Sequence, residues 1–424
     1  MLYYFSHPLK VQNINSRLKK QLIRLFGTKT TQENKRKSTS DVYTFLRKPH
    51  LVQVGQYIPP QYKDVVKFEN AEHFYLICPE AAKQVVSLVL PSVDMSGHQL
   101  IAETNAGLGL ISTELLENGV QRVRMYESCP DFRKELMNFN EVYPGRIELF
   151  TKDIFQLPRF AYIDNMDNAN RVHSLLKNVP KRAWIDEPSM TIIGFISSLT
   201  FIKYLIKSLA LQSGPISYGR IQLFAFMKHK DYAILTAGPE ENLNVYQVVS
   251  ILFNMLFDYE LIQRFPRDIF LPWEHHSNKR VYVKNHNHDE IYLVKVNYKK
   301  DLPVKIEQLL PLYFFIRQFY GKGNKKIIPT IEKWVPDCGR NIIVPTLDHE
   351  MYFENINIFT RFRELTPTQI LSIFMEMVNN PTYKGSPFTA MIENSLLKTE
   401  TVETYIADAT LERNFIEDME EKFD

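Results

Sequence analysis

The alternation of apolar, strand-like runs with helical segments between Gln99 and Asp153 constrains the fold of this chain more than any other feature. Two consecutive parallel strands need a crossover between them, which is usually a helix. Strands are expected at Gln99–Thr104, Val120–Glu127 and Arg146–Thr151, with helices at Leu110–Asn118 and Cys129–Phe139. This order predicts an α/β fold with a doubly wound, mostly parallel sheet.

The pattern continues less regularly through the middle of the chain and then changes to helices. Further strands are expected at Ser189–Ile196, Arg220–Met227 and Ala233–Ala237, and a hairpin at Val281–Lys284 with Ile291–Val296. Further helices are expected at Glu80–Leu90, Phe201–Leu211, Tyr246–Phe257, Val304–Tyr320 and Thr366–Met377. The last of these begins with threonine before proline, a favourable helix start.

Charge is distributed unevenly, although the net charge is only +3. Nine lysines and arginines and a single acid, Glu33, lie in the first forty residues. Apolar residues interleave with the basic ones from Arg17 to Phe26, which predicts an amphipathic basic helix typical of a mitochondrial transit segment. The alternative is a basic arm that stays attached and contacts phosphates.

These changes of pattern divide the chain into four expected parts. They are a basic targeting segment or flexible arm (1–43), the α/β domain (44–297), a smaller helical C-terminal domain (298–411) and an acidic tail (412–424). No apolar run reaches the roughly twenty residues of a membrane span, so none is expected. The cysteines form no CxxC pair, and the histidines at 275, 276, 286 and 288 are interpreted as polar turn residues, so no metal site is expected.

The turn after the first strand of the α/β domain has the features of a nucleotide-type cofactor site. Glycines there let a ligand approach the backbone closely, and the next helix offers its N-terminal amides to a negative group. Acids end the second and third strands, where they can meet ribose hydroxyls and an adenine edge. The candidate cofactor residues are Glu103, Asn105, Gly107, Gly109, Glu127 and Asp153. A Rossmann-like domain without a cofactor is the alternative.

Several motifs resemble those of the ribosomal RNA adenine dimethyltransferases. His73–Pro79 (HFYLICP) resembles the family's lead-in motif, 103–113 its first S-adenosylmethionine motif, and Phe270–Pro272 a late Phe-x-Pro motif. The resemblance extends from about Phe68 to Val296, and Tyr218–Ile221 and Leu365–Pro367 are most similar to the second mitochondrial paralogue. It implies a class I methyltransferase fold, with Glu127 and Asp153 at the ribose and adenine of S-adenosyl-L-methionine.

The family's catalytic motif, Asn-Leu/Ile-Pro-Tyr, is degenerate in this chain. The corresponding residues after Gly194 are Phe195, Ile196, Ser197 and Ser198. In the family, the Asn oxygen accepts hydrogens from the adenine amine and the aromatic ring stacks on the flipped base. Phe195 has no hydrogen-bonding atom, and Ser198 has no ring. Phe195 is either a buried residue at a strand end or a stacking surface; in both cases efficient methylation is not expected, and S-adenosylmethionine binding is residual or lost.

Basic residues beside aromatic ones suit single-stranded or melted nucleic acid. The candidate contacts are Lys181, Arg182, Lys228, Lys230, Arg264, Arg267, Lys279, Arg280, Lys322, Lys325 and Lys326. Each of them taken alone is equally compatible with ordinary solvated surface. The set gains weight only together with the resemblance, because members of the family bind RNA.

The resemblance therefore implies a transcription initiation factor of the mitochondrial matrix. Such a factor would act with the single-subunit mitochondrial RNA polymerase and help to hold promoter DNA open. One alternative is an enzyme that dimethylates two adjacent adenines in mitochondrial small-subunit ribosomal RNA. The other is a non-catalytic RNA-binding protein of ribosome assembly.

Overall fold

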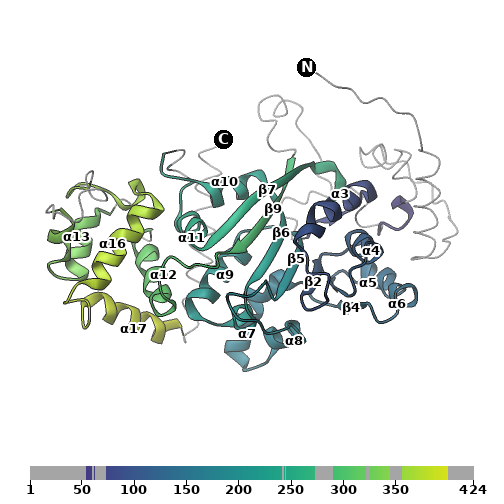
Figure 1. Ribbon diagram of the computed structural model, residues 1–424, viewed down its shortest axis with the longest axis horizontal. Coiled ribbons are helices and arrows are strands. Elements are labelled where there is room, and N and C mark those ends of the chain that lie inside the picture. The colour runs from purple at the N-terminus through teal and green to yellow at the C-terminus, as the bar shows by residue number, and fades with distance from the viewer. Residues whose placement is uncertain are drawn as a thin grey trace, which may run out of the picture.

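The computed structural model describes residues 54–59, 62, 73–240, 243, 245–272, 290–320, 325–343 and 356–399. A twisted central sheet carries helices on both faces, and further helices extend from one end of the molecule (Figure 1). Several features predicted from the sequence lie outside the described residues. They are the basic segment 1–43, the acidic tail 412–424, the strand Val281–Lys284, the histidines at 275, 276, 286 and 288, Lys279, Arg280 and Lys322.

The main sheet is mostly parallel and doubly wound. Among the described residues its strand order is β4 (Ile147–Phe150), β3 (Val123–Tyr126), β2 (Leu100–Thr104), β5 (Met190–Phe195), β6 (Ile221–Lys228), β9 (Glu290–Tyr298) and β7 (Phe257–Pro266). The first five strands pair in parallel, and β9 runs antiparallel to both of its neighbours. The strand order reverses between β2 and β5, as in other doubly wound sheets. The topology confirms the predicted α/β class and its Rossmann-like methyltransferase arrangement.

The two faces of the sheet bury separate hydrophobic cores, because successive residues of a strand point to opposite faces. Ile192 and Leu223 enter one core, while their neighbours Ile193 and Phe224 enter the other. The face of Ile193 is covered by α3 (Pro79–Val89), α4 (Leu110–Glu117), α5 (Pro130–Leu136) and α6 (Phe139–Val142). The face of Ile192 is covered by α7 (Leu157–Asp167), α8 (Arg171–Leu175), α9 (Thr200–Leu211), α10 (His229–Thr236) and α11 (Val248–Leu256).

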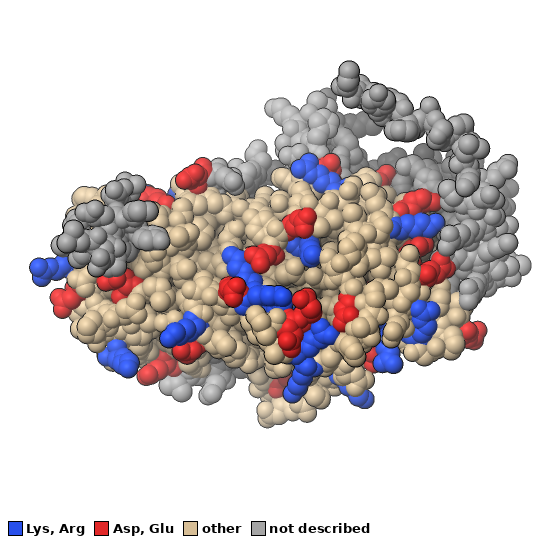
Figure 2. Space-filling view, viewed as in Figure 1, with Lys and Arg blue, Asp and Glu red and all other residues tan. Residues whose placement is uncertain are grey.

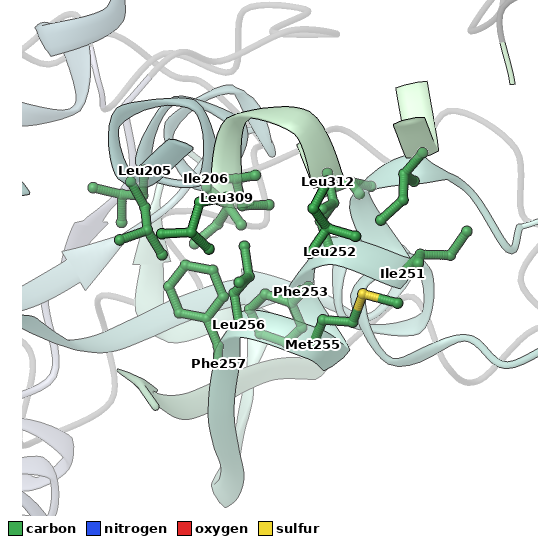
Figure 3. Packing of buried hydrophobic residues seen from close by; sticks show 14 of the residues in the cluster. Leu205, Ile206, Ile251, Leu252, Phe253, Met255, Leu256, Phe257, Leu309 and Leu312 are labelled. Carbon is green, nitrogen blue, oxygen red and sulfur yellow. The ribbon is translucent and has the colours of Figure 1, made fainter. Parts of the chain in front are cut away.

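The C-terminal helices are continuous with the second of these cores. They are α12 (Ile306–Tyr320), α13 (Ile327–Trp334), α14 (Cys338–Ile343), α16 (Pro367–Asn379) and α17 (Pro387–Thr399). Leu309 and Leu312 of α12 pack among apolar residues of α9 and α11, such as Leu205 and Leu252 (Figure 3). A division between residues 297 and 298 therefore separates an α/β part from a helical part, and the two parts share one core. The domain boundary expected at this position stays a prediction.

The helix predicted to start at Thr366 is confirmed, together with its start signal. The Thr366 hydroxyl accepts a hydrogen bond from the backbone N–H of Gln369 at 3.3 Å, and the Gln369 side chain accepts one from the Thr366 N–H at 2.9 Å. Pro367 occupies the first turn of the helix. Backbone N–H groups there have no acceptor within the helix, so the missing N–H of proline costs no hydrogen bond. Both signals are local, which explains why the sequence was sufficient to locate them.

One predicted strand is wrong, and another has different partners from those expected. The run Ala233–Ala237 lies mostly in the helix α10, which buries Ile234 and Leu235, because short apolar runs fit a buried helix as well as a strand. Ile291–Val296 does form a strand, but it is inserted between β6 and β7. One of these partners, β7, follows α11 directly and was not predicted from the sequence. The pairing of Ile291–Val296 therefore depends on the arrangement of the whole sheet and not on a local hairpin.

Candidate functional site

The predicted cofactor turn joins β2 to α4 with three residues of left-handed backbone. Asn105, Gly107 and Gly109 have φ angles of 51°, 54° and 62°. Asparagine is one of the few residues with a side chain that tolerates this conformation, so Asn105 keeps the path of the turn where the family has glycine. A Cβ on Gly107 would lie 3.0 Å from the Tyr75 ring, and one on Gly109 would lie 2.8 Å from Phe139. Aromatic side chains of this chain thus fill the space beside both glycines.

The acids that end β2 and β3 are buried and bonded to the turn and its helix. Glu103 accepts hydrogen bonds from the backbone N–H and the hydroxyl of Ser112 in α4, at 2.9 and 2.5 Å. Glu127 accepts from the backbone N–H groups of Gly107 and Cys129, both at 2.7 Å. The two carboxylates therefore hold the turn against the sheet. Any role toward a ligand would be additional to this structural one.

The acid that ends β4 is tied back to β2. Asp153 accepts hydrogen bonds from the Thr104 hydroxyl at 2.7 Å and from the backbone N–H of Phe155 at 2.9 Å. His73 Nδ1 lies 3.5 Å from the other carboxylate oxygen of Asp153. The structure thus places all six predicted cofactor residues at the carboxyl ends of β2, β3 and β4 and in the turn beside them. In open α/β sheets this is the edge that binds ligands.

The buried carboxyls of Glu103 and Glu127 have strongly altered acidity. Burial and, to a lesser extent, the nearby Glu127 raise the pKa of Glu103 to about 7, although the hydrogen bonds from Ser112 act to lower it. Burial likewise raises the pKa of Glu127 to about 7, against its two backbone donors. Desolvation disfavours the charged carboxylate in both cases. Near neutral pH, this edge of the sheet therefore carries less negative charge than its sequence indicates.

The raised pKa values predict that stability falls as pH increases from about 4.5 to about 7. The unfolded chain loses these protons near the ordinary glutamate pKa of 4.5, whereas the folded chain keeps them up to about 7. Protonation therefore favours the folded state, and this contribution is complete below pH 4.5 and lost above 7. Urea unfolding between pH 5 and 8 should show a flatter decline for Glu103→Gln than for the unchanged protein. Glu141→Gln, which removes an exposed carboxylate, is the control, and an unchanged slope in Glu103→Gln would contradict the prediction.

The side chain of Asn105 is buried without a hydrogen-bond partner. Its exposure is 4%, and neither its Oδ1 nor its Nδ2 atom is bonded within the described structure. An unpaired buried amide costs free energy, and such groups call for an explanation. A polar ligand in the turn would supply both missing partners. The turn thus has one feature that suits a cofactor, the orphaned amide, and one that does not, the aromatic rings beside the glycines.

The residues of the degenerate motif lie at the end of β5 and just beyond it. Phe195 is 2% exposed, and its ring stacks on Phe74 with centroids 4.1 Å apart. Phe270 packs against the same ring in a T-shaped arrangement, with centroids 5.5 Å apart. Ile196 is buried, Ser197 is half-buried, and Ser198 is exposed. Phe195 therefore has the surroundings of a core residue, with no face open for stacking on a base.

Two of the predicted nucleic-acid residues flank this aromatic group. The Lys228 ammonium lies 5.2 Å and the Arg267 guanidinium 4.8 Å from the centroid of the Phe74 ring. Arg267 also donates hydrogen bonds to the backbone carbonyls of Phe270 and Pro272, at 2.8 and 2.6 Å. Lys228 is the last residue of β6, and Lys230 lies in the first turn of α10. Arg264 lies on β7 beside Tyr292. These four cations share the carboxyl edge of the sheet.

The other described basic candidates are not part of this group. Lys181 and Arg182 lie at the amino edge of the sheet, where Arg182 pairs with Asp94 at 3.1 Å. Lys325 and Lys326 lie before α13 in the helical C-terminal part. On the face shown in Figure 2, positive and negative side chains intermingle. The eight candidates that the structure describes therefore do not form one basic surface.

Two residues that shape the site, Gly194 and Phe74, were not predicted from the sequence. A Cβ on Gly194 would lie 2.2 Å from the Thr104 side chain and 2.8 Å from the Thr104 carbonyl oxygen, so the close approach of β2 and β5 requires glycine. Phe74 was noted only as part of a family motif, although it stacks on Phe195 and contacts both cations. The sequence did contain a signal for Gly194, because a glycine within a buried strand often marks a close approach of two backbones. No local feature of the sequence indicated the role of Phe74.

Comparison with known proteins is consistent with the geometry. No family model matches the chain. It is 32% identical over 365 residues to dimethyladenosine transferase 2, mitochondrial, of Drosophila melanogaster, covering 78% of this chain and 81% of the relative. The protein of the same name from Rattus norvegicus is 25% identical over 317 residues, covering 71% and 76%. A solved 23S rRNA methyltransferase, ErmE, has 13% identity and a TM-score of 0.44, covering 72% of this chain and 99% of that one.

These relatives are named as mitochondrial, which supports the predicted mitochondrial location. None of the described helices is long and apolar enough to cross a membrane. The identity and coverage of the Drosophila relative agree with the motifs at His73–Pro79 and 103–113 and with the strand order of the sheet. The chain belongs to the mitochondrial dimethyladenosine transferase 2 group of the ribosomal RNA adenine dimethyltransferase family.

Proposed function

We propose that this protein is a transcription initiation factor of the mitochondrial matrix that uses a methyltransferase fold without efficient methyl transfer. It acts with the single-subunit mitochondrial RNA polymerase and stabilises melted promoter DNA. The observation that carries the proposal is the burial of Phe195 at the position where methyl transfer needs a hydrogen-bond acceptor. Promoter DNA and the polymerase are its partners in this proposal.

The chemical argument concerns the adenine amine. Its lone pair is delocalised into the ring, so the amine must be held and aimed before it can attack a methyl group. Phe195 offers no acceptor, and its ring is enclosed by Phe74 and Phe270. Ser198, at the position of the stacking ring, is exposed and donates its hydroxyl to Thr200 at 3.2 Å. The site therefore lacks both the acceptor and the stacking surface of the family's motif.

The charge at the same edge supports a role in binding nucleic acid. Lys228 and Arg267 lie over an aromatic ring, and Lys230 and Arg264 are nearby and largely exposed. Cations on this edge can neutralise the phosphates of a strand that enters the site. Arg267 is held in place by two backbone carbonyls, so its position is fixed before any ligand arrives. A non-catalytic site with these cations can still hold unpaired nucleotides.

The decisive experiment measures promoter-dependent transcription with the purified polymerase and, in parallel, methyl transfer to the hairpin of mitochondrial small-subunit ribosomal RNA. We expect transcripts that depend on this protein, and no methylated adenine. Lys228→Gln should weaken binding to melted promoter DNA and reduce the magnitude of the salt-dependence slope by about 1, because one phosphate contact is lost. Lys333→Gln removes an exposed lysine of α13 and is the matched control.

The outcomes separate the candidate functions. Transcription that proceeds equally well without the protein, on linear promoter DNA, would overturn the proposal. In that case binding to ribosomal RNA without methylation would indicate a ribosome-assembly protein. Equal effects of Lys228→Gln and Lys333→Gln on DNA binding would show that the carboxyl edge of the sheet is not part of the nucleic-acid interface.

A second candidate function is S-adenosyl-L-methionine-dependent dimethylation of adjacent adenines in mitochondrial small-subunit ribosomal RNA. It is favoured by Glu103, Glu127 and Asp153, which end adjacent strands at one edge, and by the unpaired amide of Asn105. Bound there, S-adenosylmethionine would supply the methyl group, and Glu127 and Asp153 would face its ribose and adenine. Calorimetric titration with S-adenosylmethionine tests this candidate. Tight binding together with two methyl groups transferred per hairpin would establish it in place of the first.

A further inference from the structure

Two neighbouring apolar side chains are exposed on a turn in the helical C-terminal part. Ile358 is 48% exposed and Phe359 is 66% exposed. The other exposed large apolar residues of the described structure stand singly in the sequence. Single exposed apolar residues are ordinary on a protein surface, whereas an adjacent pair that includes an aromatic ring calls for an explanation. The proposed function so far makes no use of this turn.

Hydrogen bonds within the turn hold the exposed pair in place. The Asn357 side chain accepts a hydrogen bond from the Phe359 N–H at 2.8 Å, and the Asn357 carbonyl accepts one from the Thr360 N–H at 3.1 Å. The Thr360 hydroxyl accepts a further bond from the Asn357 N–H at 2.9 Å. Asparagine side chains commonly stabilise turns in this way. The backbone that carries Ile358 and Phe359 is therefore positioned before any partner binds.

The residues on both sides of the turn anchor it to the helical part. Ile356 and Phe362 are buried in the core that the C-terminal helices share with the sheet. Between the turn and Phe362, Arg361 forms an antiparallel bridge with Lys326, the residue just before α13. The chain thus buries an apolar residue on each side of the exposed pair and leaves the pair itself in solvent.

The surface around the exposed pair is positively charged. The Lys326 ammonium lies 4.6 Å from the centroid of the Phe359 ring, and Arg361 is exposed beside the turn. The described residues 325–330 and 356–364 contain four lysines and arginines and one acid, Glu364. This balance favours a partner that carries negative charge around its own binding site.

The arrangement of the pair favours a protein pocket over stacked bases. A ring that inserts between two bases needs both of its faces, and the Lys326 ammonium lies over one face of Phe359. Ile358 has no ring that could stack on a base. Protein interfaces, in contrast, often centre on an aromatic side chain that fills an apolar pocket, with charged groups at the rim. The turn combines these two features.

We propose that the turn 357–360 is a protein-docking element that places Ile358 and Phe359 in an apolar pocket with carboxylates at its rim. Lys326 and Arg361 pair with these carboxylates and steer the two proteins together. The identity of the partner rests on the proposed function, under which the pocket belongs to the mitochondrial RNA polymerase. The turn lies next to α13, among the helices outside the sheet (Figure 1), so docking leaves the carboxyl edge free to hold DNA.

The test is the affinity of the full chain for the purified polymerase, measured by biolayer interferometry without DNA. Phe359→Ala should weaken binding at least about tenfold, as expected for an aromatic anchor at the centre of an interface. Met137→Ala is the matched control, because Met137 is also 66% exposed but lies at the end of α5. Both variants should keep the melting temperature of the unchanged protein, which separates a binding defect from misfolding.

Charge variants test the carboxylates at the rim of the pocket. Arg361→Gln should weaken polymerase binding severalfold and make it less dependent on salt, because an attraction between opposite charges is lost. Arg122→Gln removes an exposed arginine just before β3 and should leave both quantities unchanged. Equal salt dependence in the two variants would contradict the charged rim.

The outcomes separate this inference from the proposed function. Polymerase that binds Phe359→Ala as tightly as the unchanged protein would overturn the inference and leave the proposed function in place. Loss of binding to melted promoter DNA in Phe359→Ala, with polymerase binding unchanged, would assign the turn to nucleic acid and also overturn the inference. Polymerase that does not bind the unchanged protein would overturn both.

Discussion

Replacing Phe195 with alanine is expected to destabilise the protein by about 3–4 kcal/mol, the usual loss for a buried phenylalanine. Phe195 is 2% exposed, and its ring stacks on Phe74 with centroids 4.1 Å apart and forms a T-shaped pair with Phe270 at 5.5 Å. Its removal loses the burial of apolar surface and leaves a cavity between two rings that are themselves held in place. The midpoint and slope of urea unfolding measure the change.

Phe359→Ala is the control for this substitution, because its ring is 66% exposed and should contribute less than about 0.5 kcal/mol. The comparison also decides between the two sequence-based interpretations of Phe195. If the Phe195 ring turned outward to stack on a base, its removal would change the free energy of unfolding only slightly. A loss in Phe195→Ala as small as that in Phe359→Ala would therefore contradict the core role and reopen the stacking interpretation.

Replacing Gly194 with alanine should have a comparable effect, about 3 kcal/mol or more, for the opposite reason. The added Cβ would lie 2.8 Å from the carbonyl oxygen of Thr104, which belongs to the paired strand β2. Backbone atoms in the middle of a sheet cannot move away as a flexible side chain can, so β2 and β5 must separate. Thermal unfolding, monitored by circular dichroism, measures the loss.

Gly238→Ala is a control matched in chemistry, since a Cβ at Gly238 would meet no atom within 4 Å. That change should leave stability unchanged or raise it by up to about 1 kcal/mol, because alanine restricts the unfolded chain. The Gly194→Ala variant should also disturb the candidate cofactor edge, since Thr104 donates to Asp153 at 2.7 Å. Equal melting temperatures for the two variants would show that β2 and β5 do not approach as closely as described.

The two substitutions indicate how the degenerate site is built. The family's catalytic position has become part of the hydrophobic packing between β5 and the segment that contains Phe74. The preceding residue on the same strand, Gly194, has no side chain because the neighbouring strand β2 leaves no room for one. A single Phe195→Asn change would therefore place an amide in an apolar aromatic group, at the cost of burying an unpaired polar side chain. We do not expect it to restore methyl transfer.

Local patterns in the sequence were sufficient for much of the fold. Strands and helices alternate from β2 to β4 as predicted, since a buried strand and an amphipathic helix each leave a periodic pattern in their own residues. The start of α16 at Thr366 followed from local hydrogen-bonding chemistry in the same way. Short apolar runs such as Ala233–Ala237 were misassigned, because their few residues fit a buried helix and a strand equally well.

The sequence by itself thus determined the α/β class and the glycine-bearing turn after β2, because both depend on residue type and local spacing, and together with the family resemblance it indicated the loss of the acceptor at Phe195. Only the tertiary structure decided the insertion of β9 between β6 and β7 and the stacking of Phe74 on Phe195. These features join residues that are far apart in the chain. Their contacts depend on strand order and register, which hydrophobic burial sets for the whole sheet and no single segment encodes.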